Sequence, residues 1–190
     1  MILEGLVTTL NHDGSVHLAP MGPETTPRLD RFTLRPFKTS QTFRNLKGHG
    51  EGVLHVTDDV LLMARAALGP VEPAPAWEAA SQIRGFVLRD ACRFFEFRVQ
   101  AIHDDQERAR IDLCVLHTGS FREFFGFNRG KHAILEAAIL ATRTHLLPLG
   151  EIAAEFRKLE TIVQKTGGEQ EREAFAVLST HLRRVQEQRS

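Results

Sequence analysis

The hydrophobic pattern of this chain changes its period once, close to Gly119, and that change limits the fold more than any other feature. Before it, short segments alternate apolar and polar residues, as β-strands with one buried face do. After it, apolar residues recur every three or four positions, as in amphipathic helices. We therefore expect a β domain over residues 1–120 and a C-terminal helical extension over residues 121–190.

Six segments of the first part have the strand pattern. They are residues 2–10, 15–20, 31–35, 53–57, 85–103 and 109–115. Hairpin turns or a single helix join most of them, and the helix 60–68 is apolar on nearly every face, which predicts burial. These features favour a small, mainly antiparallel, six-stranded barrel.

Three helices are predicted in the second part, over residues 131–147, 151–165 and 169–188. The last two form an antiparallel hairpin with one apolar seam, which serves either as packing or as a dimer contact. The first helix has a polar seam that either pairs internally, which we favour, or lines a cleft. Its members are Arg129, His132, Glu136 and Arg143.

Four phenylalanines precede these helices, at Phe121, Phe124, Phe125 and Phe127. Aromatic side chains contribute much buried apolar area, so we expect this cluster to pack between two layers of the structure.

Composition narrows the class of protein. Lys and Arg total 24, Asp and Glu also total 24, and 42% of residues are hydrophobic, which is typical of a soluble globular protein and gives no sign of nucleic-acid or membrane binding. No apolar run reaches the ~18 residues of a membrane helix, and Met1 leads directly into strand-like sequence without a leader. With only Cys92 and Cys114 present, a reducing cytoplasm is the expected location.

Nine histidines raise the question of a metal, but none has HxH, HxxxH or HExxH spacing. We expect no metal site.

The residues that carry the most chemistry lie where strand 31–35 leads into a short helix. Pro36 permits a turn, and Ser40 is a good N-cap for a helix that extends to about Leu46. A helix start has unpaired N–H groups and partial positive charge, so it attracts anions. Around it are two cations and three hydroxyls, from Arg35, Lys38, Thr39, Ser40 and Thr42. This pattern predicts a pocket for one terminal phosphate; the alternative is an ordinary cap beside solvated charges.

A second candidate is the strand end at Met21-Gly22-Pro23. A glycine at a strand end permits a ligand to approach the backbone closely, although a plain bend before the loop 24–30 explains it equally well.

Three stretches together resemble a known family. They are Glu4 to Thr9 with Ala19 to Gly22; Arg35 to Asn45 with Val56 to Asp59; and Phe127 to Gly130 with Glu136 to Arg143. The chain is similar to the DUF447 group of flavin-reductase-like proteins, and the resemblance covers nearly all of it. It implies an FMN-binding split β-barrel of six antiparallel strands plus the helical segment, and a homodimer with FMN at the subunit interface.

The resemblance also implies roles for particular residues. The FMN phosphate is bound by Arg35, Lys38, Ser40 and Thr42, in agreement with the physical interpretation above, and Thr39 belongs to the same cofactor-binding site. Asn45 helps to hold the ribityl chain or the loop, Met21 and Gly22 lie along the isoalloxazine, and Arg129 reaches the flavin or its substrate. No catalytic acid or base is implied.

The expected function is that of an FMN-dependent oxidoreductase that uses NAD(P)H or a small heteroaromatic substrate, a pterin among them. No GxGxxG follows a strand, so a nicotinamide would dock only transiently over the flavin. One alternative is a non-catalytic flavin-binding or sensor module that acts through its helical tail. Another keeps the barrel but binds a different phosphate-containing ligand, such as pyridoxal phosphate.

Overall fold

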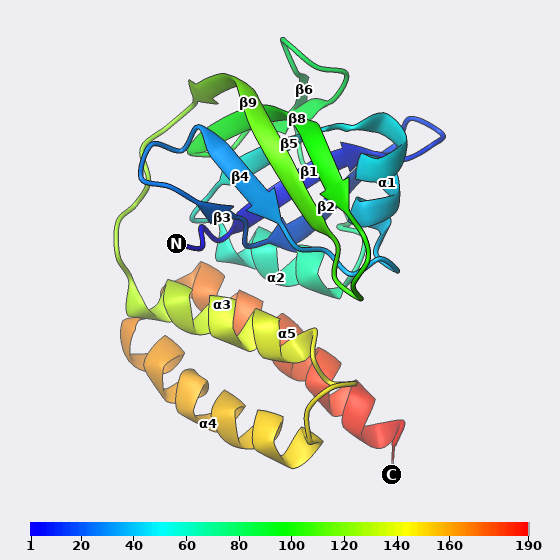
Figure 1. Ribbon diagram of the computed structural model, residues 1–190. Helices are drawn as coiled ribbons and strands as arrows, with labels where there is room; N and C mark the ends of the chain where they lie inside the picture. The colour runs from blue at the N-terminus through cyan, green and yellow to red at the C-terminus, as the bar shows by residue number, and fades with distance from the viewer. Residues whose placement is uncertain (190) are drawn as a thin grey trace. The chain divides into compact units, whose positions relative to one another are not determined.

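The structure is a computed structural model, and it describes residues 1–189. Its contacts divide the chain into two compact units (Figure 1). One contains residues 1–57 and 72–124, and the other contains residues 58–71 together with the residues from 125 onward. Residues 58–71, which the sequence assigns to the β domain, thus group with the C-terminal helices.

The first unit is built on one antiparallel sheet of seven strands. In chain order they are β1 (Gly5–Leu10), β2 (Val16–Met21), β3 (Glu24–Thr25), β4 (Arg31–Leu34), β5 (Glu51–Val56), β8 (Arg93–His103) and β9 (Arg110–Ser120). Their order in the sheet is β2-β1-β5-β8-β9-β4-β3.

The two ends of this sheet are consecutive in the chain, because β2 runs into β3 across Gly22 and Pro23. β2 pairs with β1 and β3 pairs with β4, so one bent strand links both ends of the sheet. Proline has no N–H to donate, which interrupts the ladder, while the Pro23 carbonyl accepts from the Leu3 N–H at 3.0 Å. The predicted split barrel is confirmed, with seven strands in place of six because part of the expected loop 24–30 is β3.

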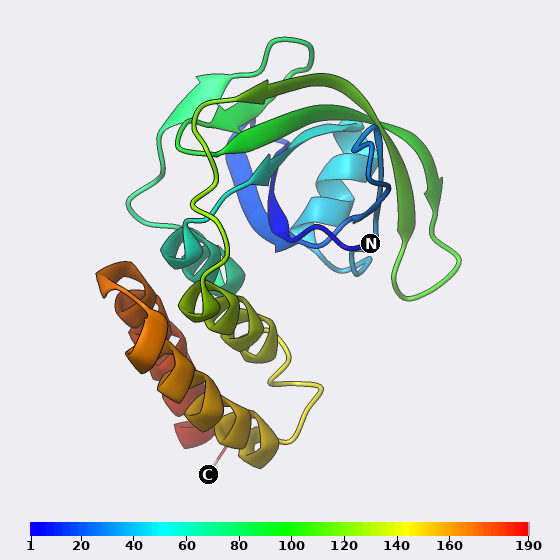
Figure 2. The ribbon, with the colours of Figure 1, turned by 90° about the vertical axis from the view of Figure 1, so that its left-hand side faces the viewer.

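Helix α1 (Gln41–His49) lies inside the outline of the curled sheet (Figure 2). Ser40 caps it as predicted, since its side chain accepts from the Phe43 N–H, and Gly50 ends it with φ 70°. Phe43 and Leu46 belong to the same buried cluster as the strand residues Phe95 and Phe97. The helix start is therefore held against the barrel core.

A two-stranded hairpin, β6 (Trp77–Ala79) and β7 (Phe86–Leu88), is a separate small sheet. The predicted strand 85–103 is thus two strands, β7 and β8. Side chains of the barrel bind the backbone of this hairpin: the Thr8 hydroxyl donates to the Phe86 carbonyl at 2.7 Å, and buried Glu96 accepts from the N–H groups of Ser81 and Gln82 at 2.9 and 2.6 Å.

The second unit contains four helices, α2 (Val60–Leu68), α3 (Arg129–Ala141), α4 (Leu149–Thr166) and α5 (Glu169–Glu187). All four contribute to one apolar core, whose largest members are Phe156 and Phe175. The predicted helical hairpin corresponds to α4 and α5. The prediction of a helix up to residue 147 is wrong, because α3 ends at Ala141 and turns precede Pro148.

The polar seam of α3 makes no internal pairs. Arg129, His132, Glu136 and Arg143 are all exposed, and within residues 1–189 none of them forms an ion pair. The buried pair of this unit is instead Lys131 with Glu171, at 2.9 Å.

The four phenylalanines are also not buried as predicted. Phe121 is 43% exposed and Phe127 is 95% exposed, with Phe124 and Phe125 between these values. Phe121 stacks on Phe94, with ring centroids 5.3 Å apart. The four side chains therefore lie at the surface and do not form a packed layer.

Candidate functional site

The predicted phosphate corner is a fixed segment of the barrel unit. The Pro36 carbonyl accepts a hydrogen bond from the Ala109 N–H at 3.0 Å, and the Arg108 guanidinium lies 4.0 Å from the centroid of the Phe37 ring. These contacts tie the segment between β4 and α1 to the start of β9. The corner is thus held on both sides, by the sheet and by the helix.

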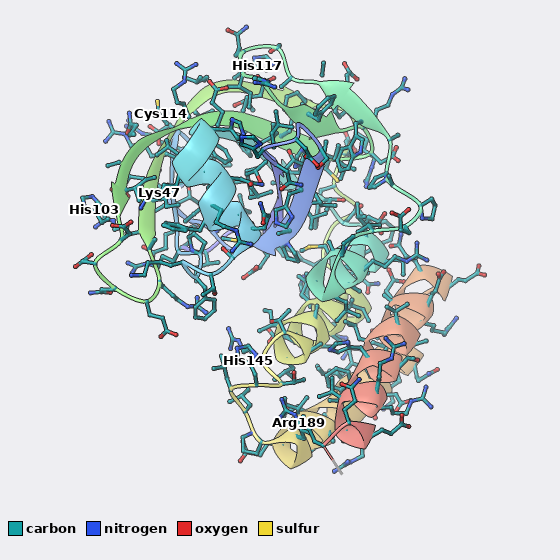
Figure 3. The ribbon with its side chains drawn as sticks, turned by 90° about the vertical axis from the view of Figure 1, so that its right-hand side faces the viewer. Lys47, His103, Cys114, His117, His145 and Arg189 are labelled. Atoms are coloured by element: carbon teal, nitrogen blue, oxygen red, sulfur yellow. The ribbon has the colours of Figure 1, made fainter. Side chains whose placement is uncertain are left out.

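The two cations predicted for this corner already have partners. Arg35 Nε lies 2.7 Å from Glu24 Oε1, and Lys38 Nζ donates to the carbonyl of Asp104 at 3.0 Å. Lys47, labelled in Figure 3, lies in the last turn of α1. It binds the Asp104 carboxylate at 2.7 Å and lowers the pKa of that carboxylate. Lys38 and Lys47 therefore bind the same residue, Asp104, through its carbonyl and its carboxylate respectively.

The hydroxyls at the helix start differ in accessibility. Thr39 is exposed and Ser40 is half-buried. Ser40 Oγ accepts a hydrogen bond from the Phe43 N–H at 3.2 Å, and its own O–H remains free to donate to a ligand. Thr42 is only 2% exposed, with Oγ1 3.2 Å from His17 Nε2. Thr39 and Ser40 can therefore reach a ligand, whereas Thr42 is part of the packing beneath the helix.

Asn45 is likewise internal. Its Nδ2 group donates to Thr9 Oγ1 and to Asn11 Oδ1, both at 2.9 Å, and its Oδ1 accepts from Gln41 Nε2 at 2.7 Å. These bonds satisfy the buried amide, so Asn45 links α1 to strand β1 and to the turn after it.

Two residues at this corner are missing from the predicted set. Arg44 bonds back over the first turn of α1 to the Thr39 carbonyl, at 2.7 Å. His17 reaches Thr42 from β2, and burial, followed by the charge of Arg44, lowers the pKa of its imidazole. The spacing of Arg44, four residues after the cap, is the signal that could have revealed it, because helical side chains point toward the N-terminus.

Met21 and Gly22 lie at the bend between β2 and β3. Met21 packs against the barrel core. A Cβ on Gly22 would lie 2.8 Å from Ile2 Cγ2 and 3.0 Å from Glu4 Oε1, so the chain's own N-terminal segment occupies that side of the glycine. This close approach gives a structural reason for the glycine.

Arg129 is the first residue of α3, in the helical unit. It is exposed, and within residues 1–189 no hydrogen-bond or ion-pair partner holds it. Its guanidinium is available to an anionic ligand.

The barrel also holds a buried imidazole outside this corner. The Leu88 N–H donates to Nε2 of His55 at 2.9 Å, so Nδ1 carries the proton and donates to the Leu6 carbonyl at 3.1 Å. Desolvation lowers the pKa of His55 to about 4, and the bond to Leu6 opposes part of that shift. His55 is therefore a neutral structural residue at neutral pH.

Two further searches bear on the kind of site. Within residues 1–189, no three His, Cys, Asp or Glu side chains are grouped as metal ligands would be. No helix in that range has the length and apolar character that crossing a membrane requires. What the corner offers chemically is a set of hydroxyl, N–H and cationic donors, which suits an anion.

Comparisons with known proteins concern the family and the fold of the chain. The family model described as "Protein of unknown function (DUF447) N-terminal domain" matches residues 3–122, and the DUF447 C-terminal model matches residues 128–180. No curated protein matches the chain in sequence.

Among solved structures, an FMN-bound DUF447 protein from Methanosarcina mazei is similar over 95% of this chain and 94% of its own, with a TM-score of 0.84 and 25% identity. The flavin reductase HpaC, solved with NADP+, matches over 67% of this chain and 82% of its own, with a TM-score of 0.56 and 17% identity. The styrene monooxygenase flavin reductase of Pseudomonas putida matches over 63% of this chain and 80% of its own, with a TM-score of 0.53 and 13% identity.

The last two similarities concern the fold alone, which is that of the flavin-reductase-like split barrel. The two family models together span most of the sequence, from the first strand to α5. The chain therefore belongs to the DUF447 family.

Proposed function

We propose that this protein is an FMN-binding flavoprotein that acts as an oxidoreductase, with NAD(P)H or a small heteroaromatic compound, such as a pterin, as its reaction partner. The observation that carries the proposal is the likeness to the FMN-bound M. mazei protein, which extends over 95% of this chain. When bound, the flavin supplies the hydride chemistry, and the protein binds and orients it.

The donors at the start of α1 fit the phosphate of FMN. The exposed Thr39 and half-buried Ser40 offer hydroxyls, the first turn of a helix offers unpaired N–H groups, and no acidic residue occupies that turn. A phosphate with nearly two negative charges gains charge-assisted hydrogen bonds from such a set.

The remaining predicted residues take different parts in this proposal. Arg35 and Lys38 each use one donor, toward Glu24 and the Asp104 carbonyl, and their remaining N–H groups can bind the phosphate. Thr42 and Asn45 are buried and bonded to β1, β2 and the turn after β1, so in this proposal they hold α1 in place. For Met21, Gly22 and Arg129, contact with the isoalloxazine or the substrate stays a prediction.

The proposal includes a homodimer with FMN at the subunit interface. Every residue of β2 is half-buried, and within residues 1–189 β1 is the one strand that pairs with it, so the other edge of this end strand has no strand partner and can meet a second subunit. Light scattering of the purified protein should give twice the 21.4 kDa chain mass. A monomer that binds FMN fully would contradict this part.

The function is tested by spectroscopy of the purified protein. We expect a flavin spectrum, or its appearance on addition of FMN, and bleaching of the flavin absorbance under anaerobic NADH or NADPH. Tight FMN binding without bleaching by either donor or by candidate pterins would favour the non-catalytic flavin-binding module. A protein with no affinity for FMN would contradict the proposal altogether.

A further inference from the structure

We infer that Arg44 is the guanidinium that binds the phosphate of FMN at the start of α1, and that Gln41 and Asn45 hold it in position. This inference rests on the proposed function, because it concerns the same ligand. It differs from the sequence-based set, in which Arg35 and Lys38 supply the positive charge.

Arg44 is fixed at the helix start by three hydrogen bonds. Its NH1 group donates to the Thr39 carbonyl at 2.7 Å, and its NH2 and Nε groups donate to Gln41 Oε1 at 2.7 and 3.2 Å. A guanidinium has five N–H donors in a planar fork, so two remain for a ligand. The side chain is exposed, which leaves those two accessible.

The orientation of Gln41 is set from inside the barrel unit. Its Nε2 group donates to Oδ1 of Asn45 at 2.7 Å, which leaves Gln41 Oε1 to face Arg44. Asn45 is 4% exposed, and its own orientation is fixed because it donates to Thr9 and Asn11. A chain of hydrogen bonds thus leads from buried strand β1 to the guanidinium, and it pre-organises the group that meets the ligand.

Arg35 and Lys38 lack this arrangement. The Glu24 carboxylate, 2.7 Å from Arg35 Nε, already balances the charge of Arg35, and Lys38 is held by its bond to the Asp104 carbonyl, outside the network that fixes Arg44. No acidic group balances the charge of Arg44, because its acceptors are a carbonyl and an amide oxygen. Burial and, after it, the charge of Arg44 lower the pKa of His17, whose ring contacts Thr42 in the first turn of α1.

The test compares FMN with riboflavin, which has the same ring system and ribityl chain but no phosphate. Both are titrated into the purified full-length protein, and the quenching of flavin fluorescence gives each dissociation constant. For Arg44→Gln we expect the FMN dissociation constant to rise by about 10- to 100-fold, the size of one charged hydrogen-bond pair. The riboflavin dissociation constant should change by less than roughly two-fold, since no phosphate contact is lost.

Lys47→Gln is the matched control. It removes one positive charge from the same helix, but at the last turn, and it should leave both dissociation constants within roughly two-fold of the wild-type values. Arg35→Gln and Lys38→Gln are the competing variants. If either weakens FMN binding more than Arg44→Gln does, the inference is wrong.

The wild-type protein separates this inference from the proposed function. If the wild type binds FMN no better than riboflavin, the phosphate site of the proposed function fails. If the wild type prefers FMN and Arg44→Gln keeps the full preference, the site stands and only the role of Arg44 fails.

The positioning role of Gln41 needs its own measurement. Gln41→Met removes the amide that holds Arg44, and we expect FMN binding to weaken by about 3- to 10-fold, less than for loss of the guanidinium itself. Added to Arg44→Gln, the same change should have almost no further effect on FMN binding, because the group it positions is gone. Full additivity of the two changes, or an equal loss of riboflavin binding, would contradict the positioning role.

Discussion

The backbone N–H of Leu88 donates to Nε2 of His55 at 2.9 Å, so a histidine that is 0% exposed ties the hairpin strand β7 to the barrel. Both ring nitrogens are used, since Nδ1 donates to the Leu6 carbonyl. This bond requires Nε2 to stay unprotonated, which makes the barrel sensitive to acid.

The pH dependence of stability follows from His55. Burial lowers its pKa in the folded protein to about 4, against about 6.5 in the unfolded chain. The unfolded state therefore binds more protons between these values, and stability falls as the pH falls through this range, by up to about 3 kcal/mol in all. His55→Gln removes this term, so the variant's free energy of unfolding should depend less steeply on pH between 6.5 and 4. Equal slopes in urea titrations of both proteins would contradict the assignment.

The buried pair of the helical unit predicts a large stability effect. Lys131 and Glu171 side chains are 14% and 7% exposed, and Lys131 also donates to the Asp58 carbonyl at 2.8 Å. Lys131→Met leaves the Glu171 carboxylate without its cation and should destabilise the protein by about 3–5 kcal/mol. Adding Glu171→Gln should recover part of that loss in urea denaturation. No recovery would mean that the two charges are not coupled.

The cap residue separates helix stability from ligand binding. Ser40→Ala should lower stability by about 1 kcal/mol, because the Phe43 N–H loses its acceptor. Ser40→Asp keeps a good cap, and hence the melting temperature, but places a negative charge beside the phosphate. We expect Ser40→Asp to weaken FMN binding and to spare riboflavin binding. Equal effects on both flavins would place the phosphate elsewhere.

Two glycines give opposite predictions for the same substitution. A Cβ on Gly5 would lie 2.4 Å from the His55 carbonyl oxygen, so Gly5→Ala should destabilise the barrel by about 1–3 kcal/mol. Gly48 is within α1, and a Cβ there meets nothing within 4 Å, so Gly48→Ala should stabilise by about 0.5–1 kcal/mol. Thermal denaturation of both variants checks the pair, and a stable Gly5→Ala protein would contradict the strand register.

Local sequence signals predicted much of this fold. The barrel strands follow from alternation of apolar residues, as in β8 and β9, and the start of α1 follows from Ser40 alone. The prediction that this helix continues to Leu147 was wrong, because α3 ends at Ala141 and turns follow it. Pro148 disfavours helical geometry only at Leu147, so it does not explain the earlier end. The short strand β3 depends on pairing with β4, and the sequence of the loop 24–30 does not show that Glu24 and Thr25 pair with Thr33 and Phe32.

The site was harder to predict than the fold. Its residue types follow from the sequence, but the partners do not: Arg35 meets Glu24, and Lys38 meets Asp104, which is 66 residues away. Exposure is also a tertiary property. Asn45 is buried while Phe127 is 95% exposed, the reverse of what their chemistry favours, because packing around each decides the outcome.

The most direct measurement is the affinity of the wild-type protein for FMN relative to riboflavin, at one ionic strength and neutral pH. Because a dianionic phosphate at the start of α1 gains several charge-assisted hydrogen bonds, we predict that FMN binds at least about 100-fold more tightly. Equal dissociation constants for the two flavins, or no binding of either, would contradict the assignment of this corner as an FMN phosphate site.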